Sequence, residues 1–256
     1  VLASVRWSAV IRDLLALCRS IGIYRLRAGH QATLRKLYEP LVKPGQLVFD
    51  VGAHAGDRTA CFNGLGARVV SVEPQPLFAR FLALVNQRHD RVTVLRGVVS
   101  SKPGRHVLHV NSRNPTVSTL SDDFVAAAGH DHDNWDGQQW DRQLEVDALT
   151  LDLMIQQHGT PDFIKIDVEG AEYEVLLGLS QPVGALSFEF TLIQRALAHD
   201  CLDRCQALGM TEFNVSLGET HQFQFGQWQD IGAVKDWIDQ LPASANSGDV
   251  YARLPR

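Results

Sequence analysis

The chain has 256 residues, of which 45% are hydrophobic and 21% charged, as is typical of a globular protein with a sizeable core. Its formal net charge of −5 argues against a general attraction to nucleic-acid backbones. The four cysteines form no Cys-x-x-Cys pair, which indicates buried thiols in a reducing compartment rather than a disulfide framework.

Residues 1–43 predict an N-terminal helical extension of two helices, the second near Gln31 to Leu41, and residues 44–256 predict the main domain. The stretch from Val1 to Ile23 is apolar, but charged residues interrupt it before it reaches the roughly 18 to 20 residues of a membrane span. These residues are Arg6, Arg12, Asp13 and Arg19. No cleavage site typical of a signal peptide follows. We therefore expect no integral membrane segment, a cytoplasmic location, and a helix that packs on the domain and covers part of its site. Peripheral membrane contact is the alternative.

The segments that follow the turn at Lys43-Pro44-Gly45-Gln46 alternate between strand and helix. Strands are predicted at Leu47 to Phe49, Ala67 to Val72 and Arg91 to Leu95, and helices at Arg58 to Leu65 and Leu77 to Asn86. Such alternation is typical of a parallel sheet with crossover helices.

The next stretch breaks this alternation. Val98 to Val110 predicts a hairpin around Lys102-Pro103-Gly104, and Asn111 to Asp141 predicts a long polar loop with one short helix. The remaining elements are a strand at Leu144 to Val146, a helix at Leu149 to His158, a strand at Phe163 to Ile166, a helix at Glu172 to Leu179, a strand at Ala185 to Phe190, a helix and two strands, a helix at Ile231 to Leu241 and a strand near Asp249 to Arg253. The pattern predicts an α/β fold with a doubly wound, mostly parallel sheet, N-terminal helices and a C-terminal antiparallel hairpin.

A glycine-bearing segment, Asp50-Val51-Gly52-Ala53-His54-Ala55-Gly56, follows the first strand. Glycine lets the backbone approach a ligand closely, and ligands of such folds bind beyond the carboxyl ends of the strands. A carboxylate at Asp50 suits an amine-bearing ligand better than a pyrophosphate. The G-x-G-x-x-G fingerprint of nicotinamide cofactors fails here, because His54 and Asp57 occupy its second and third glycine positions.

Glu73 stands at the end of the second strand, 73 − 50 = 23 residues after Asp50. A carboxylate there can accept hydrogen bonds from both ribose hydroxyls of a nucleoside. By itself Glu73 indicates only an adenosine-type ligand. Together with Asp50-x-Gly52-x-x-x-Gly56 it predicts S-adenosylmethionine, and the alternative is a helix cap and a surface acid.

The segment Phe163-Ile164-Lys165-Ile166-Asp167-Val168-Glu169-Gly170-Ala171-Glu172 places two acids, Asp167 and Glu169, directly after a buried strand. It resembles the KIDVEGAE signature of the FkbM family of methyltransferases. The segments Leu47 to Gly56, Val70 to Pro74, Leu149 to Asp152 and Ser187 to Phe190 are also similar to segments of that family. The signature is specific, whereas many methyltransferases share the glycine loop. His54 departs from the family, which more often has asparagine there, so its contact with cofactor or substrate stays open.

The resemblance implies a Rossmann-like methyltransferase fold and O-methylation of a hydroxyl, commonly on a sugar or another specialised metabolite. Methyl transfer to an alcohol requires reactants held in line and a base that takes the alcohol proton. Asp167 is the first candidate for that base, with Glu169 and His54 as alternatives. Glu169 is equally consistent with an acid that the helix dipole favours at a helix start. Lys165 is expected to be a buried ion-pair partner.

The remaining expected site residues fall into two groups. Those expected at the cofactor are Asp50, Gly52, Ala53, His54, Gly56, Glu73, Pro74 and Asp167, with backbone contacts to adenine from Val98 and Val99. Those expected at the substrate are Glu189, which is unusual inside an apolar strand, Ser118 in the long loop, and Trp135, stacked on a sugar face.

The segment His130-Asp131-His132-Asp133 favours a solvated polar loop over a divalent metal site. We expect a small hydroxylated substrate, most simply a carbohydrate, and no nucleic-acid partner. The competing hypotheses are a nicotinamide-dependent oxidoreductase and a catalytically silent domain that binds a nucleoside. The sequence leaves the oligomeric state open.

Overall fold

The computed structural model describes residues 12–25, 27–130 and 134–255 of the chain. Within them the main sheet has seven strands in the order β3-β2-β1-β7-β8-β10-β9. Their bounds are β1 Leu47–Val51, β2 Arg68–Glu73, β3 Val92–Arg96, β7 Phe163–Ile166, β8 Ala185–Thr191, β9 Glu212–Leu217 and β10 Ser247–Arg253. Neighbouring strands are parallel except β10, which is antiparallel to both β8 and β9.

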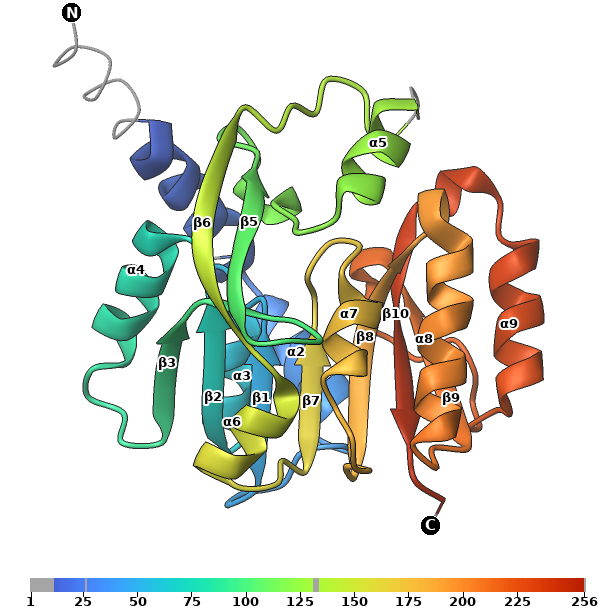
Figure 1. Cartoon of the computed structure of the whole chain (residues 1–256). Helices are drawn as coiled ribbons and strands as arrows, with labels where there is room; N and C mark the ends of the chain where they lie inside the picture. The colour runs from blue at the N-terminus through green and yellow to red at the C-terminus, as the bar shows by residue number, and fades with distance from the viewer. Residues whose placement is uncertain (1–11, 26, 131–133, 256) are drawn as a thin grey trace, which may run out of the picture.

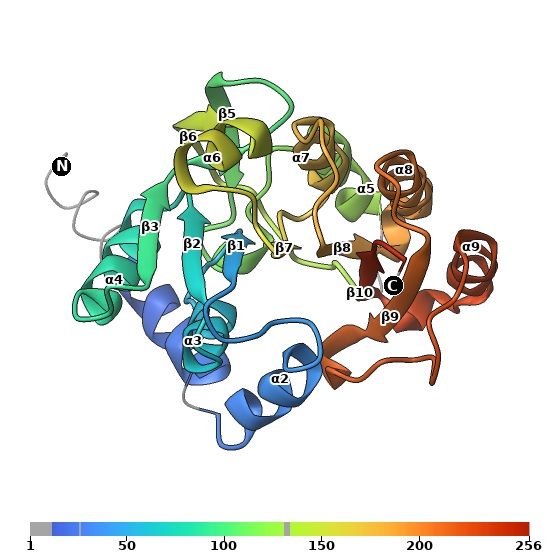
Figure 2. The same cartoon turned by 90° about the horizontal axis from the view of Figure 1, so that it is seen from below.

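Helices cover both faces of this sheet (Figure 2). One face carries α2 His30–Tyr38, α3 Asp57–Gly64 and α4 Pro76–Asn86, and the other carries α6 Leu151–His158, α7 Glu172–Leu177, α8 Arg195–Ala207 and α9 Ile231–Gln240. The doubly wound, mostly parallel α/β sheet expected from the sequence is thus confirmed.

Two apolar clusters explain why the central strands read as continuous apolar runs. Val48 packs with Tyr38 of α2 and Phe62 of α3 on one face, whereas Phe49 belongs to the cluster with α6 to α9 on the other. Every residue of β1 is buried, as in parallel sheets that helices cover on both sides. Burial on both faces fixes the register of β1, and with it the position of the loop that follows.

The hairpin predicted over Val98 to Val110 is wrong. β4 Val98–Val99 and β5 Gly104–Val110 do not pair with each other; both pair with β6 Arg142–Leu149, β4 in parallel and β5 antiparallel. The turn at Lys102-Pro103-Gly104 does reverse the chain, but β6, which arrives some forty residues later, lies between the two strands. Local turn signals carry no information about such a distant partner.

The C-terminal part also differs in detail from the expectation. Between α8 and α9 the described residues form β9, and in place of a second strand they form one isolated bridge between Phe213 and Gln229. β9 and β10 are antiparallel neighbours as expected, although α9 connects them.

Strands β4, β6 and β5 form a second, three-stranded sheet. It lies beyond the carboxyl ends of the parallel strands, together with α5 Asp122–His130 and the helix over residues 12–20 (Figure 1). α5 is the short helix expected in the long polar loop. These additions surround the edge of the sheet at which ligands of such folds bind.

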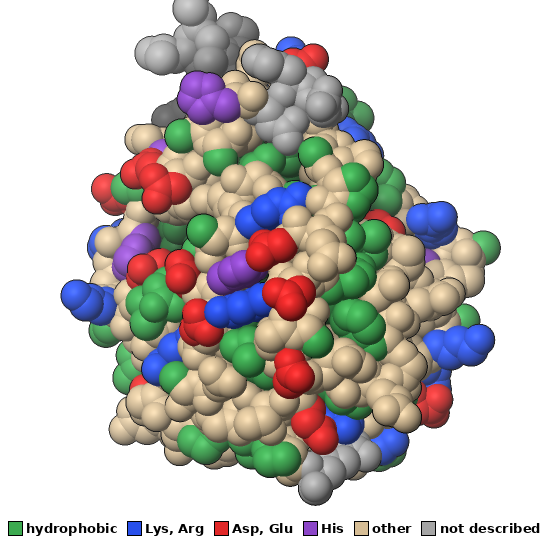
Figure 3. Space-filling view, turned by 90° about the vertical axis from the view of Figure 1, so that its right-hand side faces the viewer, with side chains coloured by type: hydrophobic (Ala, Val, Ile, Leu, Met, Phe, Trp, Pro, Cys, Tyr) green, Lys and Arg blue, Asp and Glu red, His purple; other side chains and the backbone are tan. Residues whose placement is uncertain are grey.

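Cys61, Cys201 and Cys205 are buried and Cys18 is exposed, and all four are free thiols. Among the described residues, no helix is both long and apolar enough to cross a membrane. On the face drawn in Figure 3, acidic, basic and histidine side chains are interspersed.

Candidate functional site

Two adjoining cavities open at the carboxyl ends of β1, β2, β7 and β8, with volumes of about 510 Å³ and about 600 Å³. Gly52, His54, Thr116 and Asp167 line both of them. We refer to them as the first and the second cavity.

The first cavity is mainly apolar, and its acids are Glu73 and the shared Asp167. Its apolar lining comes from Val51, Val72, Pro74, Val98, Val99, Leu108, Pro115, Leu120 and Val168. Apolar walls with a few placed polar groups suit a planar base and its ribose. This lining contains the expected adenine neighbours Val98 and Val99, and it also contains Ser118.

Glu73 stabilises the loop that follows β1. Its Oε2 accepts a hydrogen bond from the backbone N–H of His54 at 2.9 Å, and its Oε1 accepts one from Gln75 at 2.8 Å. Burial raises the pKa of this carboxyl to about 7, against the lowering effect of the two backbone bonds. Because a carboxylate has about four acceptor sites, two remain for ribose hydroxyls.

The glycine loop lies against the end of β7. Gly52 has φ +82°, and a Cβ added to it would lie 1.8 Å from the carbonyl oxygen of Asp167. Gly56 has φ +78°, and its added Cβ would lie 2.2 Å from Leu82 Cδ2 in α4. The positive φ favours glycine at both positions, and the backbone carbonyl of Asp167 requires it at Gly52. Gly56 lines neither cavity, and its contact is with a flexible side chain of α4.

Asp50 is buried at the end of β1 and lines the second cavity. Its Oδ2 accepts a 2.5 Å hydrogen bond from Thr59, whose hydroxyl also contacts Ser71 at 2.8 Å. Burial raises the pKa of Asp50 to about 6, and the Thr59 hydrogen bond opposes that rise. The Asp50 carboxylate therefore lies where it would meet the amino group of a ligand bound in the second cavity. Its contact with such an amine stays a prediction.

His54 lies between the cavities in a left-handed backbone conformation, with φ +45°. Its ring stacks on Phe78 with centroids 4.4 Å apart, and its Nε2 lies 3.3 Å from Ser20 Oγ. Burial lowers the pKa of His54 to about 4, so the imidazole is neutral at neutral pH.

The second cavity is lined by more acids than bases. The acids are Asp50, Asp57, Asp167, Glu169, Glu189 and Glu219, and the bases are Arg58 and Lys165. Both bases already have partners, because Arg58 pairs with Asp57 at 2.6 Å and Lys165 pairs with Asp167 at 3.2 Å and with Asp249 at 2.9 Å. The lining therefore has an excess of negative charge.

Asp167, Glu169 and Glu189 form a carboxylate trio, with one ligand oxygen from each lying within 4.8 Å of the others. Although burial acts to raise it, the pKa of Asp167 is lowered by Lys165 and Arg58. Burial and the neighbouring carboxylates raise the pKa values of Glu169 and Glu189 well above the usual range. The spacing of the trio would also admit a hard divalent cation, but Asp167 already pairs with Lys165.

Glu172, the last residue of the KIDVEGAE segment, holds the loop that bears Asp167 and Glu169. Its two carboxylate oxygens accept hydrogen bonds from the backbone N–H groups of Val168 at 3.0 Å and Gly170 at 2.9 Å. Glu169 itself has φ +57°. The final glutamate of the signature thus has a positional role, because it fixes a loop that the strand alone would not.

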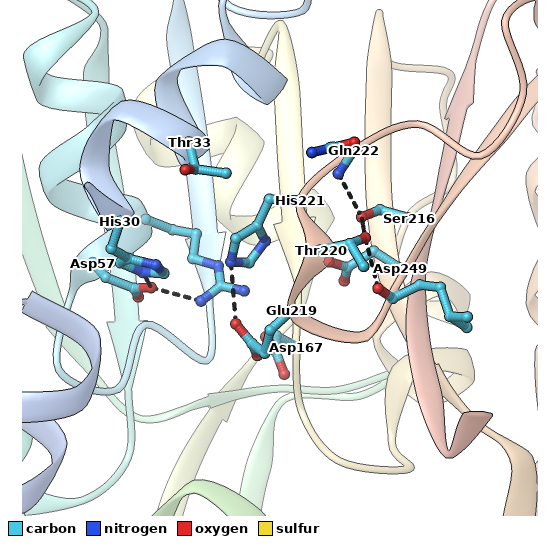
Figure 4. Close-up of polar contacts among 12 residues, drawn as sticks. His30, Thr33, Asp57, Asp167, Ser216, Glu219, Thr220, His221, Gln222 and Asp249 are labelled. Carbon is cyan, nitrogen blue, oxygen red and sulfur yellow. Dashed lines mark hydrogen bonds and ion pairs between the residues drawn. The ribbon is translucent and has the colours of Figure 1, made fainter. Parts of the chain in front are cut away.

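The structure adds residues that the sequence interpretation missed. Asp57 accepts from His30 at 2.9 Å and from Arg58, and Glu219 contacts His221 at 3.1 Å (Figure 4). His30 and His221 meet edge-on, with ring centroids 5.3 Å apart. Asp57 and Arg58 directly follow Gly56, so the glycine loop was a signal for them. Nothing in the sequence indicated that Glu219 would reach this cavity.

Two expected substrate residues lie apart from the carboxylate trio. Ser118 lines the first cavity, with Val98 and Val99, and not the second. Trp135 is buried in an apolar cluster with Val117, Phe124 and Ala128, and it lines neither cavity. In the segment His130 to Asp133, which the sequence predicts to be a solvated polar loop, Asp131, His132 and Asp133 lie outside the described residues.

Residues 50–243, most of the chain and all of the loops just described, match the family of the methyltransferase FkbM domain. The chain belongs to this family. This membership counts against the nicotinamide-dependent alternative.

The chain is 28% identical over 169 residues to a hexuronic acid methyltransferase, AglP of Haloferax volcanii. The matched residues cover 65% of this chain and 64% of AglP. The match thus spans less than two thirds of the relative. Two solved structures are also similar. An FkbM methyltransferase from Methylobacillus flagellatus has 15% identity and a TM-score of 0.41, covering 96% of this chain and 60% of that one. An O-methyltransferase from Bacillus cereus has 15% identity and a TM-score of 0.41, covering 97% and 91%.

Proposed function

We propose that this FkbM-family chain is a methyltransferase that transfers the methyl group of S-adenosylmethionine to a hydroxyl oxygen of a sugar or a glycosylated metabolite. The observation that carries the proposal is the carboxylate trio Asp167, Glu169 and Glu189, which lines the second cavity beside the glycine loop. Such a group can accept hydrogen bonds from several hydroxyls and can take the proton that the reacting hydroxyl loses.

In this proposal the first cavity holds the adenosine and Glu73 accepts from its ribose. Asp50, on the second cavity, meets the amino group of the methionine moiety. The requirement for glycine at Gly52 supports this arrangement, because a side chain there would overlap the Asp167 carbonyl and push apart the two loops that form the pocket.

The proton passes to the carboxylate trio as a unit. Asp167 is fixed by Lys165 and its lowered pKa makes it a weak base, whereas Glu169 and Glu189 have raised pKa values and are the more basic members. The acceptor oxygen bonds to the methyl carbon as the carbon–sulfur bond breaks, and the hydroxyl proton moves to the trio. His54, with its pKa near 4, is the weaker candidate.

The charge of the second cavity favours a hydroxyl acceptor over a carboxylate acceptor. An anionic acceptor would enter a pocket whose two cations are already paired with carboxylates, and like charges in a partly buried site repel strongly. The hexuronic acid methyltransferase that the chain resembles supports a carbohydrate as the acceptor class.

The test is turnover with methyl-labelled S-adenosylmethionine and a panel of neutral sugars, glycosides and uronic acids, followed by mass spectrometry. We expect a methyl ether, which survives mild alkali, and not a methyl ester, which mild alkali removes. Glu189→Gln should lower kcat, whereas the matched exchange Glu145→Gln, at an exposed site on β6, should not. An alkali-labile product would contradict the hydroxyl proposal. Cofactor binding without turnover on any acceptor would support the catalytically silent domain.

A further inference from the structure

The segment before the family-matched region reaches the second cavity. The helix over residues 12–20 continues into a π-helical turn, Ile21–Arg25, and Tyr24 of this turn lines the cavity together with Asp50, Arg58 and Glu189. The family match begins at residue 50, so Tyr24 stands outside it. The extension therefore contributes a side chain to a cavity that the family domain otherwise forms.

Contacts on both sides of Tyr24 hold the turn against the glycine loop. Ser20 Oγ lies 3.3 Å from His54 Nε2, and an Arg25 N–H donates to the carbonyl of Ala55 at 3.4 Å. The Tyr24 ring meets the His54 ring edge-on, with centroids 5.7 Å apart. The position of the phenol is thus tied to the loop that we assign to the cofactor.

Arg25 adds a second anchor on α4, because its guanidinium lies 5.7 Å from the centroid of the Phe81 ring. A cation at that distance from an aromatic face is attracted to it. The turn is therefore fixed by the helix that packs beside the glycine loop as well as by the loop itself. Tyr24 is half-buried.

Tyr24 gives the second cavity a phenol ring on which an apolar ligand face can pack. The other side chains that line this cavity are charged or small, apart from the His54 imidazole. The tryptophan expected to stack on a sugar, Trp135, is buried elsewhere. A pyranose has hydroxyl edges that bond to carboxylates and an apolar C–H face that packs on an aromatic ring, and binding sites commonly combine aromatic walls with a few polar groups.

We propose that Tyr24 is a specificity-determining residue for the acceptor, against which the apolar face of a sugar packs while the carboxylate trio binds its hydroxyls. This inference rests on the proposed function, because it assumes a carbohydrate acceptor. Burial, and then the charge of Glu219, raise the pKa of Tyr24 to about 12, so its hydroxyl stays protonated and can donate to a sugar oxygen.

The first readout is binding, measured on protein saturated with S-adenosylhomocysteine. Saturation-transfer NMR with methyl glycosides of glucose, galactose, mannose and rhamnose should show magnetisation reaching ring C–H protons of at least one glycoside. Tyr24→Leu, which removes the ring, should weaken this signal, and Tyr24→Phe, which keeps the ring, should retain it. The control is Leu15→Ala, at a site on the same N-terminal helix that is 65% exposed. Melting curves check that all variants are folded.

The second readout is kinetic and uses the acceptor found by the turnover assay. Tyr24→Leu should raise its KM about tenfold, equivalent to about 1.4 kcal/mol, and leave the Kd of S-adenosylhomocysteine unchanged. Tyr24→Phe should return KM close to the wild-type value.

The two failures are distinguishable. If no glycoside binds the wild-type protein, or the acceptor is not a carbohydrate, the proposed function fails and this inference fails with it. If glycosides bind the wild type and Tyr24→Leu equally, with the same KM, Tyr24 does not select the acceptor and the proposed function stands.

Discussion

Replacing Gly52 or Gly45 by alanine separates backbone strain from the close approach of two loops. Both glycines have φ +82°. A Cβ at Gly45, in the turn before β1, meets nothing within 4 Å, whereas a Cβ at Gly52 would lie 1.8 Å from the Asp167 carbonyl oxygen. The two substitutions thus share the conformational cost and differ in the overlap.

The expected losses of unfolding free energy follow from these distances. The left-handed conformation costs an alanine roughly 1–2 kcal/mol, so Gly45→Ala should lose about that much. Gly52→Ala should lose about 1–3 kcal/mol more, the usual cost of overpacking, because backbone atoms at the end of β7 must move away. The same movement should weaken the binding of S-adenosylhomocysteine at least tenfold in Gly52→Ala and leave it unchanged in Gly45→Ala.

Urea unfolding gives the stability difference and calorimetric titration gives the affinity. The reasoning is refuted if the two variants lose equal stability and bind S-adenosylhomocysteine equally well. It is also refuted if Gly52→Ala is destabilised but keeps wild-type affinity, because the loop would then not form part of the cofactor pocket.

Three further predictions concern buried charges. Glu73→Gln keeps the side-chain volume but loses the charge and one backbone hydrogen bond. Calorimetry should therefore show that S-adenosylhomocysteine binds about 10- to 100-fold more weakly. An unchanged affinity would mean that Glu73 only stabilises the loop. Because the pKa of Glu73 is about 7, its ionised form, which ribose hydroxyls prefer, is lost as pH falls. The Kd of the wild-type protein for S-adenosylhomocysteine should therefore rise by up to about tenfold per pH unit below about pH 7. An equally pH-dependent Kd in Glu73→Gln would contradict this assignment. Lys165→Met leaves Asp167 and Asp249 without their shared cation, so the free energy of unfolding measured in urea should fall by about 3–5 kcal/mol. A second change, Asp249→Asn, should restore part of this loss. A loss below about 1 kcal/mol would show that these ion pairs do not contribute to stability.

The sequence by itself determined the central fold and the acids at the carboxyl ends of its strands. Apolar runs that end in Asp50, Glu73 and Asp167 mark parallel strands, because buried strands alternate with helices and put their carboxyl ends at one edge. The residues of such a site lie at fixed distances from these strand ends, so chain-local patterns are sufficient to find them. The long match to a family signature then indicated methyl transfer.

Only the tertiary structure decided which segments line the second cavity. Tyr24 and Glu219 stand 195 residues apart (219 − 24 = 195) yet line one cavity, and β6 lies between two strands that a local turn signal had paired with each other. Trp135, which polarity placed in an exposed loop, is buried against Phe124. These placements depend on packing between segments distant in the chain, and neither periodicity nor turn chemistry encodes which distant surfaces meet.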